Sequence, residues 1–189
     1  MDMKDTLRIW FKLRGVLIAP VYLFSIFCLY RETEHWSVMV LGMVIFLSGL
    51  YLRVWAQMHL HYRLKERKIL TTTGPYTYVR NPIYIGNTLI LTGTTMLSEL
   101  IWLVPIMVLT CVFTYSMTVR YEESHLRAKY GAPYIEYLQR VNRWFPRLER
   151  RQDRDRRRQW VFLLPSIRAE AHILLLLILP FLKDQPWHI

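Results

Sequence analysis

The sequence predicts an all-α integral membrane protein with four or five transmembrane helices, cytoplasmic amphipathic helices and no Rossmann domain. Hydrophobic residues make up 53% of the 189 residues, yet the formal net charge is +11. These two numbers are compatible because the charged residues fall between long uncharged runs, as in a chain whose apolar segments cross a bilayer. At this length we expect a single domain that covers residues 1–189.

Four uncharged runs approach the roughly 20 residues that a helix needs to cross the hydrocarbon core. They are Gly15–Tyr30, Trp36–Leu52, Asn81–Ser98 and Leu100–Val119, and the second extends to Met58 if it continues past Arg53. We interpret the first run as a span and not as a cleavable signal peptide, because it lacks a small-residue cleavage site. Only Glu99 separates the last two runs, which predicts a tight helical hairpin.

A fifth apolar segment, Ala171–Leu182, is too short to span a bilayer alone. It reaches the required length only if it joins Trp160–Ile167 across Arg168 and Glu170. The segment therefore either crosses the membrane or lies in its interface, and we favour a crossing.

Basic and non-basic loops alternate along the chain, and this pattern predicts the orientation of the spans. The N-terminal arm, the His59–Arg80 loop and the Arg120–Gln159 segment are rich in Lys and Arg, whereas the Arg31–His35 loop and the turn at Glu99 are not. We therefore expect the N-terminus and both basic segments in the cytoplasm. The run Arg147–Arg158 is expected to contact anionic lipids of the cytoplasmic leaflet, a partner that we favour over nucleic acid.

A cytoplasmic stretch over residues 71–86 reads TTTGPYTYVRNPIYIG. Gly74-Pro75 signals a turn, and Asn81 before Pro82 predicts a capped helix start. Arg80 and Asn81 then lie at the N-terminal mouth of the third span, where free N–H groups and the helix dipole favour an anionic ligand. A snorkelling arginine beside a capped helix would explain the same residues without any ligand.

A second stretch, Arg120–Gly131, continues from the fourth span and carries adjacent carboxylates, Glu122 and Glu123. Ion pairs with Arg80, Arg120 or Arg127 would explain these acids on a basic face. The alternative is that one of them binds a cationic group or accepts a proton.

Gly131 is a helix stop, and Pro133 opens a further helix. Its apolar residues recur at helical spacing, which predicts an amphipathic helix along the membrane surface: Tyr134, Tyr137, Leu138 and Val141.

Other patterns are weaker. His59 and His61 form an H-x-H pair, which does not predict a metal site without a third ligand. Cys28 and Cys111 lie in apolar runs, where they behave as small hydrophobes. The glycines form neither G-x-G-x-x-G nor a P-loop. A polar stripe on the third span would serve hydrogen bonds between helices or line a substrate cavity: Asn87, Thr88, Thr92 and Thr95.

Two linked motifs resemble a known family. The first motif, G-P-Y-x-x-x-R-N-P-x-Y-x-G at 74–86, is followed by the second motif, E-E-x-x-L-x-x-x-Y-G-x-x-Y-x-x-Y at 122–137. Together they are similar to the isoprenylcysteine carboxyl methyltransferases and their bacterial phospholipid-methyltransferase relatives. The likeness covers a catalytic core at residues 53–146, which the basic run 147–158 and an apolar helix at 160–182 follow. The eukaryotic enzymes usually have R-H-P where this chain has Arg80-Asn81-Pro82.

The resemblance implies an S-adenosylmethionine-dependent methyltransferase whose lipophilic acceptor arrives from the bilayer between helices. The implied cofactor contacts in the motifs are Tyr76, Asn81, Pro82, Ile83, Tyr84 and Glu122. Position alone adds His61, Lys68, Ile69, Leu70 and Thr71. Arginine would orient a carboxylate acceptor, and a carboxylate would remove a proton from an amine or thiol, which gives the candidate catalytic residues Arg80, Arg120, Glu122 and Glu123.

The acceptor stays open between an isoprenylcysteine-type carboxylate or thiol and a phospholipid amine. Two other functions stay open as well. The chain would bind NADPH if it were a membrane reductase of the sterol-reductase type, whose C-terminal motif region is related. A non-enzymatic lipid-binding membrane protein would bind neither cofactor.

Overall fold

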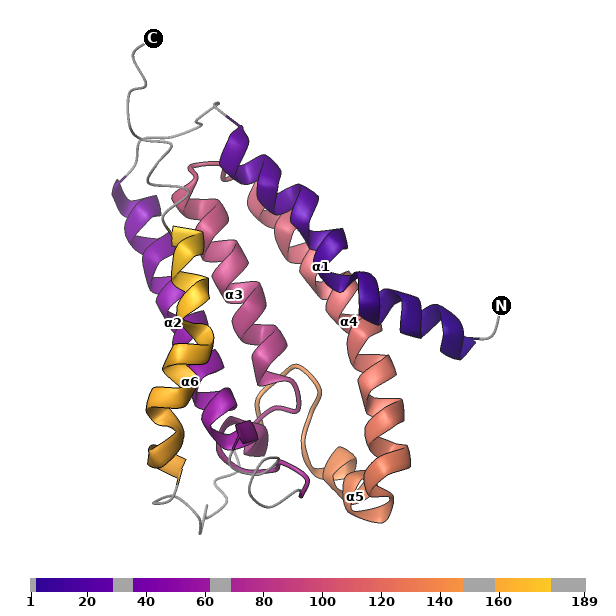
Figure 1. Cartoon of the computed structure of the whole chain (residues 1–189). Coiled ribbons are helices and arrows are strands. Elements are labelled where there is room, and N and C mark those ends of the chain that lie inside the picture. Colours follow the sequence, from indigo (N-terminus) through magenta and orange to yellow (C-terminus); the bar gives the residue numbers. More distant parts are fainter. Residues whose placement is uncertain (1–2, 29–35, 62–68, 148–158, 178–189) are drawn as a thin grey trace.

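The computed structural model describes residues 3–28, 36–61, 69–147 and 159–177, and the regular elements in these ranges are all helical (Figure 1). The four long helices are α1 (Met3–Phe27), α2 (Trp36–His61), α3 (Pro82–Leu97) and α4 (Leu103–Tyr130). Two shorter helices follow, α5 (Ala132–Arg140) and α6 (Leu163–Glu170). The 3₁₀ turn η2 (Gly74–Thr77) precedes α3, and η3 (Gln159–Phe162) and η4 (Ala171–Leu174) flank α6. The predicted all-α class is confirmed.

Among the residues that the structure describes, four helical segments are long and apolar enough to cross a membrane: Asp5–Phe27, Trp36–His61, Leu103–Tyr130 and Trp160–Leu177. Many of their large apolar side chains face outward; Leu109 of α4 is 68% exposed and Tyr51 of α2 is 69% exposed. Apolar surface of this extent is unfavourable in water, whereas lipid tails solvate it. The chain is therefore an integral membrane protein.

Helix lengths differ from the prediction at two places. α1 begins at Met3 and not near Gly15, because the basic N-terminal arm consists mostly of good helix formers. α3 has only 16 residues, which span about 24 Å of the roughly 30 Å hydrocarbon core. The C-terminal segment joins across Arg168 and Glu170 as predicted, since η3, α6 and η4 continue into each other, and Trp160–Leu177 is long enough to cross a membrane.

The backbones of α2 and α3 touch each other. Gly42 and Gly49 of α2 face Gly93 and Gly86 of α3, in antiparallel order. A Cβ atom at Gly93 would lie 2.6 Å from the carbonyl oxygen of Gly42, and one at Gly49 would lie 2.7 Å from that of Gly86. Small residues allow this close approach between membrane helices, so the two helices form one rigid pair.

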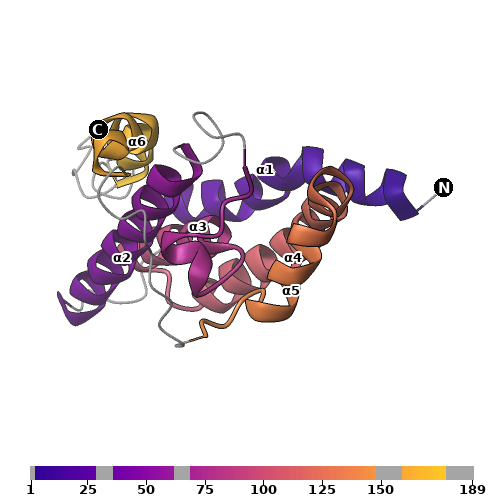
Figure 2. The same ribbon diagram turned by 90° about the horizontal axis from the view of Figure 1, so that it is seen from below.

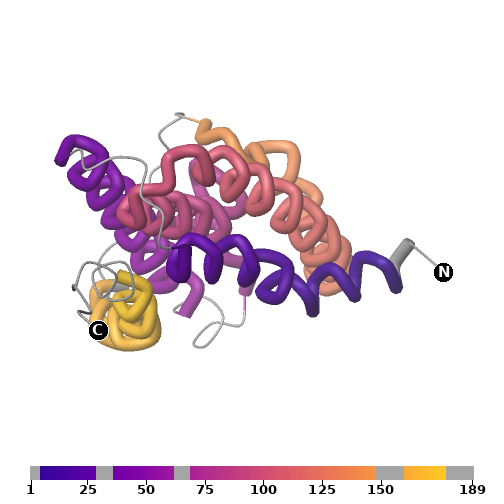
Figure 3. The backbone as a smooth tube through the Cα atoms, turned by 90° about the horizontal axis from the view of Figure 1, so that it is seen from above, coloured from indigo at the N-terminus to yellow at the C-terminus, as the bar shows by residue number. Residues whose placement is uncertain are grey.

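α1 packs against α4 through large side chains instead. Ile18, Tyr22 and Ile26 of α1 join a core cluster with Met107, Cys111, Tyr115 and Val119 of α4 and Tyr84 of α3. The rings of Trp10 and Phe113 also meet, with centroids 5.2 Å apart. Seen from either end of the bundle, α1 lies on one side of α3 and α4, and the segment Val141–Arg147 lies on the other (Figures 2 and 3).

The turns that join these helices follow the prediction. Glu99 adopts a φ of 60° in the tight connection between α3 and α4. Gly131, with a φ of 58°, ends α4 and starts α5. α5, the end of α2 and the start of α3 gather at one end of the bundle with the end of α4 (Figure 1). Both motifs therefore meet at this end.

The apolar face of α5 packs against the protein, although its amphipathic pattern suggested the membrane surface. Tyr134 and Tyr137 are buried in a cluster with Val141, which Leu70 and Leu126 cover. The reason is that Tyr137 reaches the first motif, where its hydroxyl group donates a hydrogen bond to the Tyr76 carbonyl oxygen.

Candidate active site

The first motif begins with a turn that is fixed against the end of α2. Gly74 has a φ of 61°, and a Cβ atom there would lie 2.3 Å from Nε2 of His59. The same ring places its Nδ1 atom 3.0 Å from Oγ1 of Thr73. Only glycine combines this left-handed backbone with such close contact, so the start of the motif is held in one place.

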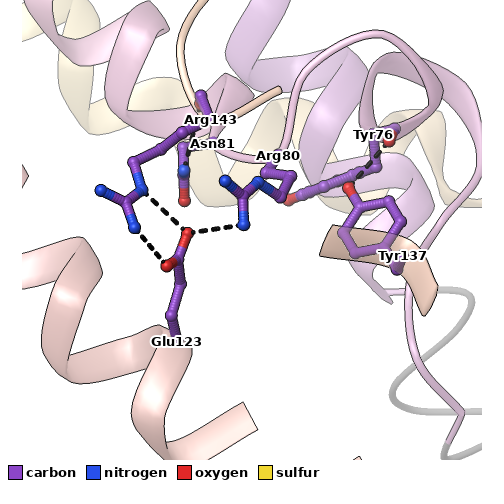
Figure 4. Close-up of polar contacts among 6 residues, drawn as sticks. All are labelled: Tyr76, Arg80, Asn81, Glu123, Tyr137 and Arg143. Atoms are coloured by element: carbon purple, nitrogen blue, oxygen red, sulfur yellow. Dashed lines mark hydrogen bonds and ion pairs between the residues drawn. The ribbon is translucent and has the colours of Figure 1, made fainter. Parts of the chain in front are cut away.

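The segment Val141–Arg147 lies along the first motif. The backbone N–H of Arg80 donates to the Asn142 carbonyl oxygen at 2.9 Å, and that of Arg147 donates to the Tyr78 carbonyl oxygen at 2.9 Å. Tyr137 adds its 2.8 Å hydrogen bond to the Tyr76 carbonyl oxygen (Figure 4). Burial, and next the Glu122 carboxylate, raise the pKa of Tyr76 well above its usual range. Its hydroxyl group therefore stays neutral.

Glu123 stands at the centre of an ion-pair cluster (Figure 4). Its Oε1 atom lies 3.1 Å from Nη1 of Arg80. Arg143 donates to both of its oxygens, from Nε at 3.0 Å and from Nη2 at 2.6 Å. This hydrogen bonding raises the pKa of Arg143. The predicted pairing with Arg80 is confirmed, and Arg143 is a second partner.

The cluster joins three separate parts of the chain. Glu123 is only 5% exposed, and two guanidinium groups compensate its buried charge. It thereby ties α4 to the first motif and to the segment Val141–Arg147. Its geometry is that of a structural clamp.

Glu122, the neighbouring acid, has different surroundings. Tyr84 donates a hydrogen bond to its Oε1 atom at 2.6 Å. The Tyr84 ring packs on Tyr115, with centroids 4.8 Å apart. Arg14 of α1 is not within ion-pair distance of Glu122 in the described structure. Among the described residues, nothing donates a hydrogen bond to the Oε2 atom of Glu122.

The N-terminal mouth of α3 is not capped as predicted. Asn81 does occupy the N-cap position, but its side chain makes no capping hydrogen bond. Its Nδ2 atom donates to the Arg143 carbonyl oxygen at 3.2 Å, because the segment Val141–Arg147 lies against it. The first N–H groups of α3 therefore lack the side-chain acceptor that the sequence suggested.

Nε of Arg80, next to this mouth, is buried and has no hydrogen-bond partner in the described part of the chain, and the same holds for Oγ1 of Thr71, three residues before Gly74. Buried polar atoms are paired in most folded proteins. An unpaired donor beside a helix N-terminus is typical of a place where a polar ligand binds.

Most of the predicted site residues lie near this end of the bundle. Thr71, Tyr76, Pro82 and Tyr84 are buried, Leu70, Asn81 and Ile83 are half-buried, and Ile69 is exposed. Two residues are placed differently. His61 is directed to α6, where its Nδ1 atom lies 3.5 Å from Oγ of Ser166. Arg120 is exposed on α4 and is not a partner of Glu122 or Glu123 in the described structure. Lys68 and residues 148–158 lie outside the described residues.

An apolar pocket of about 430 Å³ opens between α3 and α4. Its apolar lining comes from Ile85 and Leu89 of α3, Val112 of α4, and Trp144 and Phe145 of the segment Val141–Arg147. Thr88 and Tyr115 also line the pocket. The predicted polar stripe thus contributes Thr88 to a cavity wall, and Tyr115 connects the pocket to Tyr84 and Glu122.

Sequence reasoning missed a charged cluster between α2, α3 and α6. Nε and Nη2 of Arg53 lie 2.8 and 2.7 Å from Oε2 of Glu170. Nη1 of Arg53 also donates to Oδ1 of Asn87. A signal was present, because Glu170 is an acid within an apolar run that is able to span a membrane.

These features define a small helical membrane protein in which a polar site at one end of the bundle adjoins an apolar pocket. Residues 36–133, from the start of α2 into α5, match the phospholipid methyltransferase family. This match covers more than half of the 189 residues, and the chain belongs to that family. The family resemblance of the two motifs is thereby confirmed.

Three known proteins are similar in sequence to part of this chain. Protein-S-isoprenylcysteine O-methyltransferase B of Arabidopsis thaliana is 32% identical over 117 residues, which are 57% of this chain and 59% of the relative. The nickel-cobalt-cadmium resistance protein NccN of Alcaligenes xylosoxydans xylosoxydans is 31% identical over 96 residues, or 51% of this chain. The cobalt-zinc-cadmium resistance protein CzcN of Cupriavidus metallidurans is 28% identical over 96 residues. The matched region covers only 44% and 43% of these two bacterial proteins. No solved structure matches the chain.

Proposed function

We propose that this protein is an S-adenosylmethionine-dependent methyltransferase that acts on a lipid-like acceptor in the membrane. The observation that carries the proposal is the junction of two environments. Tyr84 binds Glu122 in the polar site, and its ring packs on Tyr115, which lines the apolar pocket. A methyl donor on one side and a lipid tail on the other would meet at this junction. Membership of the phospholipid methyltransferase family supports methyl transfer as the reaction.

The polar site fits the charged groups of the cofactor. S-adenosylmethionine, when bound, supplies an electrophilic methyl group from its sulfonium centre. The N-terminal N–H groups of α3 and the Nε atom of Arg80 suit the cofactor carboxylate. The Oε2 atom of Glu122 suits a cationic group, and Oγ1 of Thr71 offers one more hydrogen bond. Tyr76, Asn81, Pro82 and Ile83 would line the same site, with Leu70 beside them.

The two adjacent acids have separate roles in this proposal. Glu123 is compensated by Arg80 and Arg143, so it holds the site together. Glu122 is the carboxylate that binds the cofactor, or that accepts a proton from an amine or thiol acceptor. Arg80 holds Glu123 through Nη1, and we assign its Nε atom to the cofactor carboxylate and not to a carboxylate acceptor.

The apolar pocket would hold the acceptor tail. Its volume of about 430 Å³ lies within the usual range of small-molecule sites. Methyl transfer is an in-line displacement that needs mainly orientation and exclusion of water, and a pocket beside Tyr115 provides both. The name of the Arabidopsis relative supports an isoprenylcysteine-type carboxylate as the acceptor. The alternation of basic loops supports a cytoplasmic position for the site and for the N-terminus.

Isothermal titration of the full chain in detergent with S-adenosylmethionine tests the proposal. We expect binding by the native sequence, and a loss of about tenfold in affinity for Glu122→Gln, because a hydrogen bond to a charged group contributes about 1.5–3 kcal/mol. Glu136→Gln is the matched control, since this exposed carboxylate pairs only with Arg140 on the surface of α5 among the described residues. Its affinity should not change.

A folded protein that binds no S-adenosylmethionine would contradict the proposal. The same titration with NADPH separates the remaining functions. Binding of NADPH alone would identify a reductase, and binding of neither cofactor would leave a lipid-binding protein.

A further inference from the structure

The ion pair between Arg53 and Glu170 is buried in the membrane-spanning bundle. Arg53 lies within the family match at residues 36–133, whereas Glu170 lies outside it. The side chain of Glu170 is 3% exposed and that of Arg53 is 16% exposed. Charges inside a membrane protein are costly, and those that occur mark functional positions far more often than apolar ones do. This pair therefore needs an explanation beyond helix packing.

Few residues of the C-terminal segment are buried against the bundle, and two of the three that are fully buried are polar. Of its described residues only Ser166, Glu170 and Ile173 are buried, whereas Leu164 is 66% exposed and Leu175 is 60% exposed. The helix also changes from α to 3₁₀ geometry at Glu170, where α6 ends and η4 begins. The segment thus departs from a regular helix at the residue that meets Arg53.

A series of contacts along one face of α3 leads from this pair to the polar site. Arg53 donates to Asn87, which lies one helical turn after Tyr84 on α3, so the two side chains share a face of the helix. Tyr84 donates to Glu122 at 2.6 Å, and its ring packs on Tyr115. Tyr115 is also a wall of the apolar pocket.

We infer that Glu170 is a positioning residue for the cofactor site. By holding the Arg53 guanidinium against Asn87, it fixes the Tyr115–Tyr84 pair, and this pair orients the Glu122 carboxylate. The inference rests on the proposed function, in which Glu122 contacts S-adenosylmethionine. It makes the C-terminal helix part of the functional unit, although the helix lies outside the region that defines the family.

A purely structural ion pair would explain the same contacts without any effect on the cofactor. Stability and affinity separate the two explanations. Glu170→Gln leaves a buried arginine charge without its acid, which destabilises the protein under either explanation. Replacing both partners by apolar residues of similar size, as in Arg53→Met with Glu170→Leu, removes that unpaired charge and restores stability. It does not restore the contact between Arg53 and Asn87.

The experiment measures thermal unfolding and S-adenosylmethionine affinity for the full chain in detergent. We expect Glu170→Gln to lower the melting temperature and to weaken affinity about tenfold, as does loss of the Glu122 contact itself. The double variant should regain the melting temperature of the native sequence and keep the weakened affinity. Arg168→Gln, at an exposed position on the same helix, should change neither quantity.

Recovery of both stability and affinity in the double variant would overturn the inference, since the pair would then be structural. Affinity of Glu170→Gln within about twofold of the native value would overturn it too. Both of these outcomes leave the proposed function intact, because the native chain binds the cofactor in each. If the native chain does not bind S-adenosylmethionine, the proposed function fails and this inference fails with it.

Discussion

The two halves of the bundle are packed in opposite ways. In the α2–α3 half, glycines face each other and the backbones are in contact. In the α1–α4 half, aromatic rings and long aliphatic side chains separate the helices. The close pair is a rigid frame, and it carries the turn at Gly74 and the start of α3. The looser half bears the carboxylates and one wall of the apolar pocket.

This contrast in packing allows a small membrane protein to combine a fixed motif with a ligand-sized cavity. Sites work best when rigid elements hold the groups that must be precise. Here the first motif is attached to the rigid half through His59, and Glu123 clamps it to the looser half. Substitutions in the frame should therefore change stability most, those at the clamp less, and those in the pocket should change binding alone.

The largest effect is expected at the glycine contact. A Cβ atom at Gly93 would lie 2.6 Å from both the Gly42 carbonyl oxygen and the Phe46 backbone nitrogen, so Gly93→Ala forces the two helices apart. We expect a loss of about 3 kcal/mol in the free energy of unfolding, the upper part of the range for overpacking. Thermal unfolding in detergent measures it.

Gly15→Ala is the matched control, because a Cβ atom there meets nothing within 4 Å. The better helix propensity of alanine should stabilise α1 by up to about 1 kcal/mol. Equal effects at Gly15 and Gly93 would mean that α2 and α3 do not depend on backbone contact.

The clamp between the halves gives the next largest effect. Glu123→Gln leaves Arg80 and Arg143 without their acid, and Arg143 is already 33% exposed. Solvent reduces the cost on that side, so we expect a loss of about 2 kcal/mol, less than for a fully buried pair. Glu122→Gln should change stability by less than about 1 kcal/mol, since Gln can still accept the hydrogen bond from Tyr84. Urea unfolding in detergent distinguishes the two acids, and equal losses would refute their division into a clamp and a ligand.

The fold was largely predictable because its signals are local. Uncharged runs predicted the spans, Gly131 predicted the end of α4, and the single charge at Glu99 predicted the hairpin. Gly74-Pro75 likewise predicted the turn that the structure shows as η2. Each of these follows from a few neighbouring residues and needs no knowledge of tertiary contacts.

The partners within the site were less predictable, because they come from distant parts of the chain. Arg143 reaches Glu123 only because the chain turns back after α5. The same segment takes the Asn81 side chain away from its expected capping role. Arg53 and Glu170 are 117 residues apart, and no local pattern pairs them. Adjacent identical residues such as Glu122 and Glu123 look equivalent in sequence, and only their positions on α4 separate them.

A smaller stability effect is expected where α5 covers the first motif. Tyr137→Phe removes the 2.8 Å hydrogen bond to the Tyr76 carbonyl oxygen and keeps the buried ring. We expect a loss of about 1 kcal/mol in the free energy of unfolding, the net value of one hydrogen bond. Tyr130→Phe, which lies at the edge of the same cluster, is a suitable control. A loss as large as that at Gly93 would show that the motif and not the helix pair is the rigid part.

The smallest stability effect and the most selective binding effect are expected in the pocket. Ser116 lines it from α4 and is half-buried, so Ser116→Phe fills space without meeting the glycine contact. We expect stability within about 1 kcal/mol of the native value, because the pocket accommodates the added ring. S-adenosylmethionine affinity should stay the same, while binding of a radiolabelled S-farnesylcysteine should weaken about tenfold, since the ring occupies the volume of the tail. Leu109→Phe adds bulk to the exposed face of the same helix and should change neither affinity. If Ser116→Phe weakened the S-adenosylmethionine affinity instead, the pocket would be part of the polar site. The looser half would then not keep the cofactor region and the tail region apart.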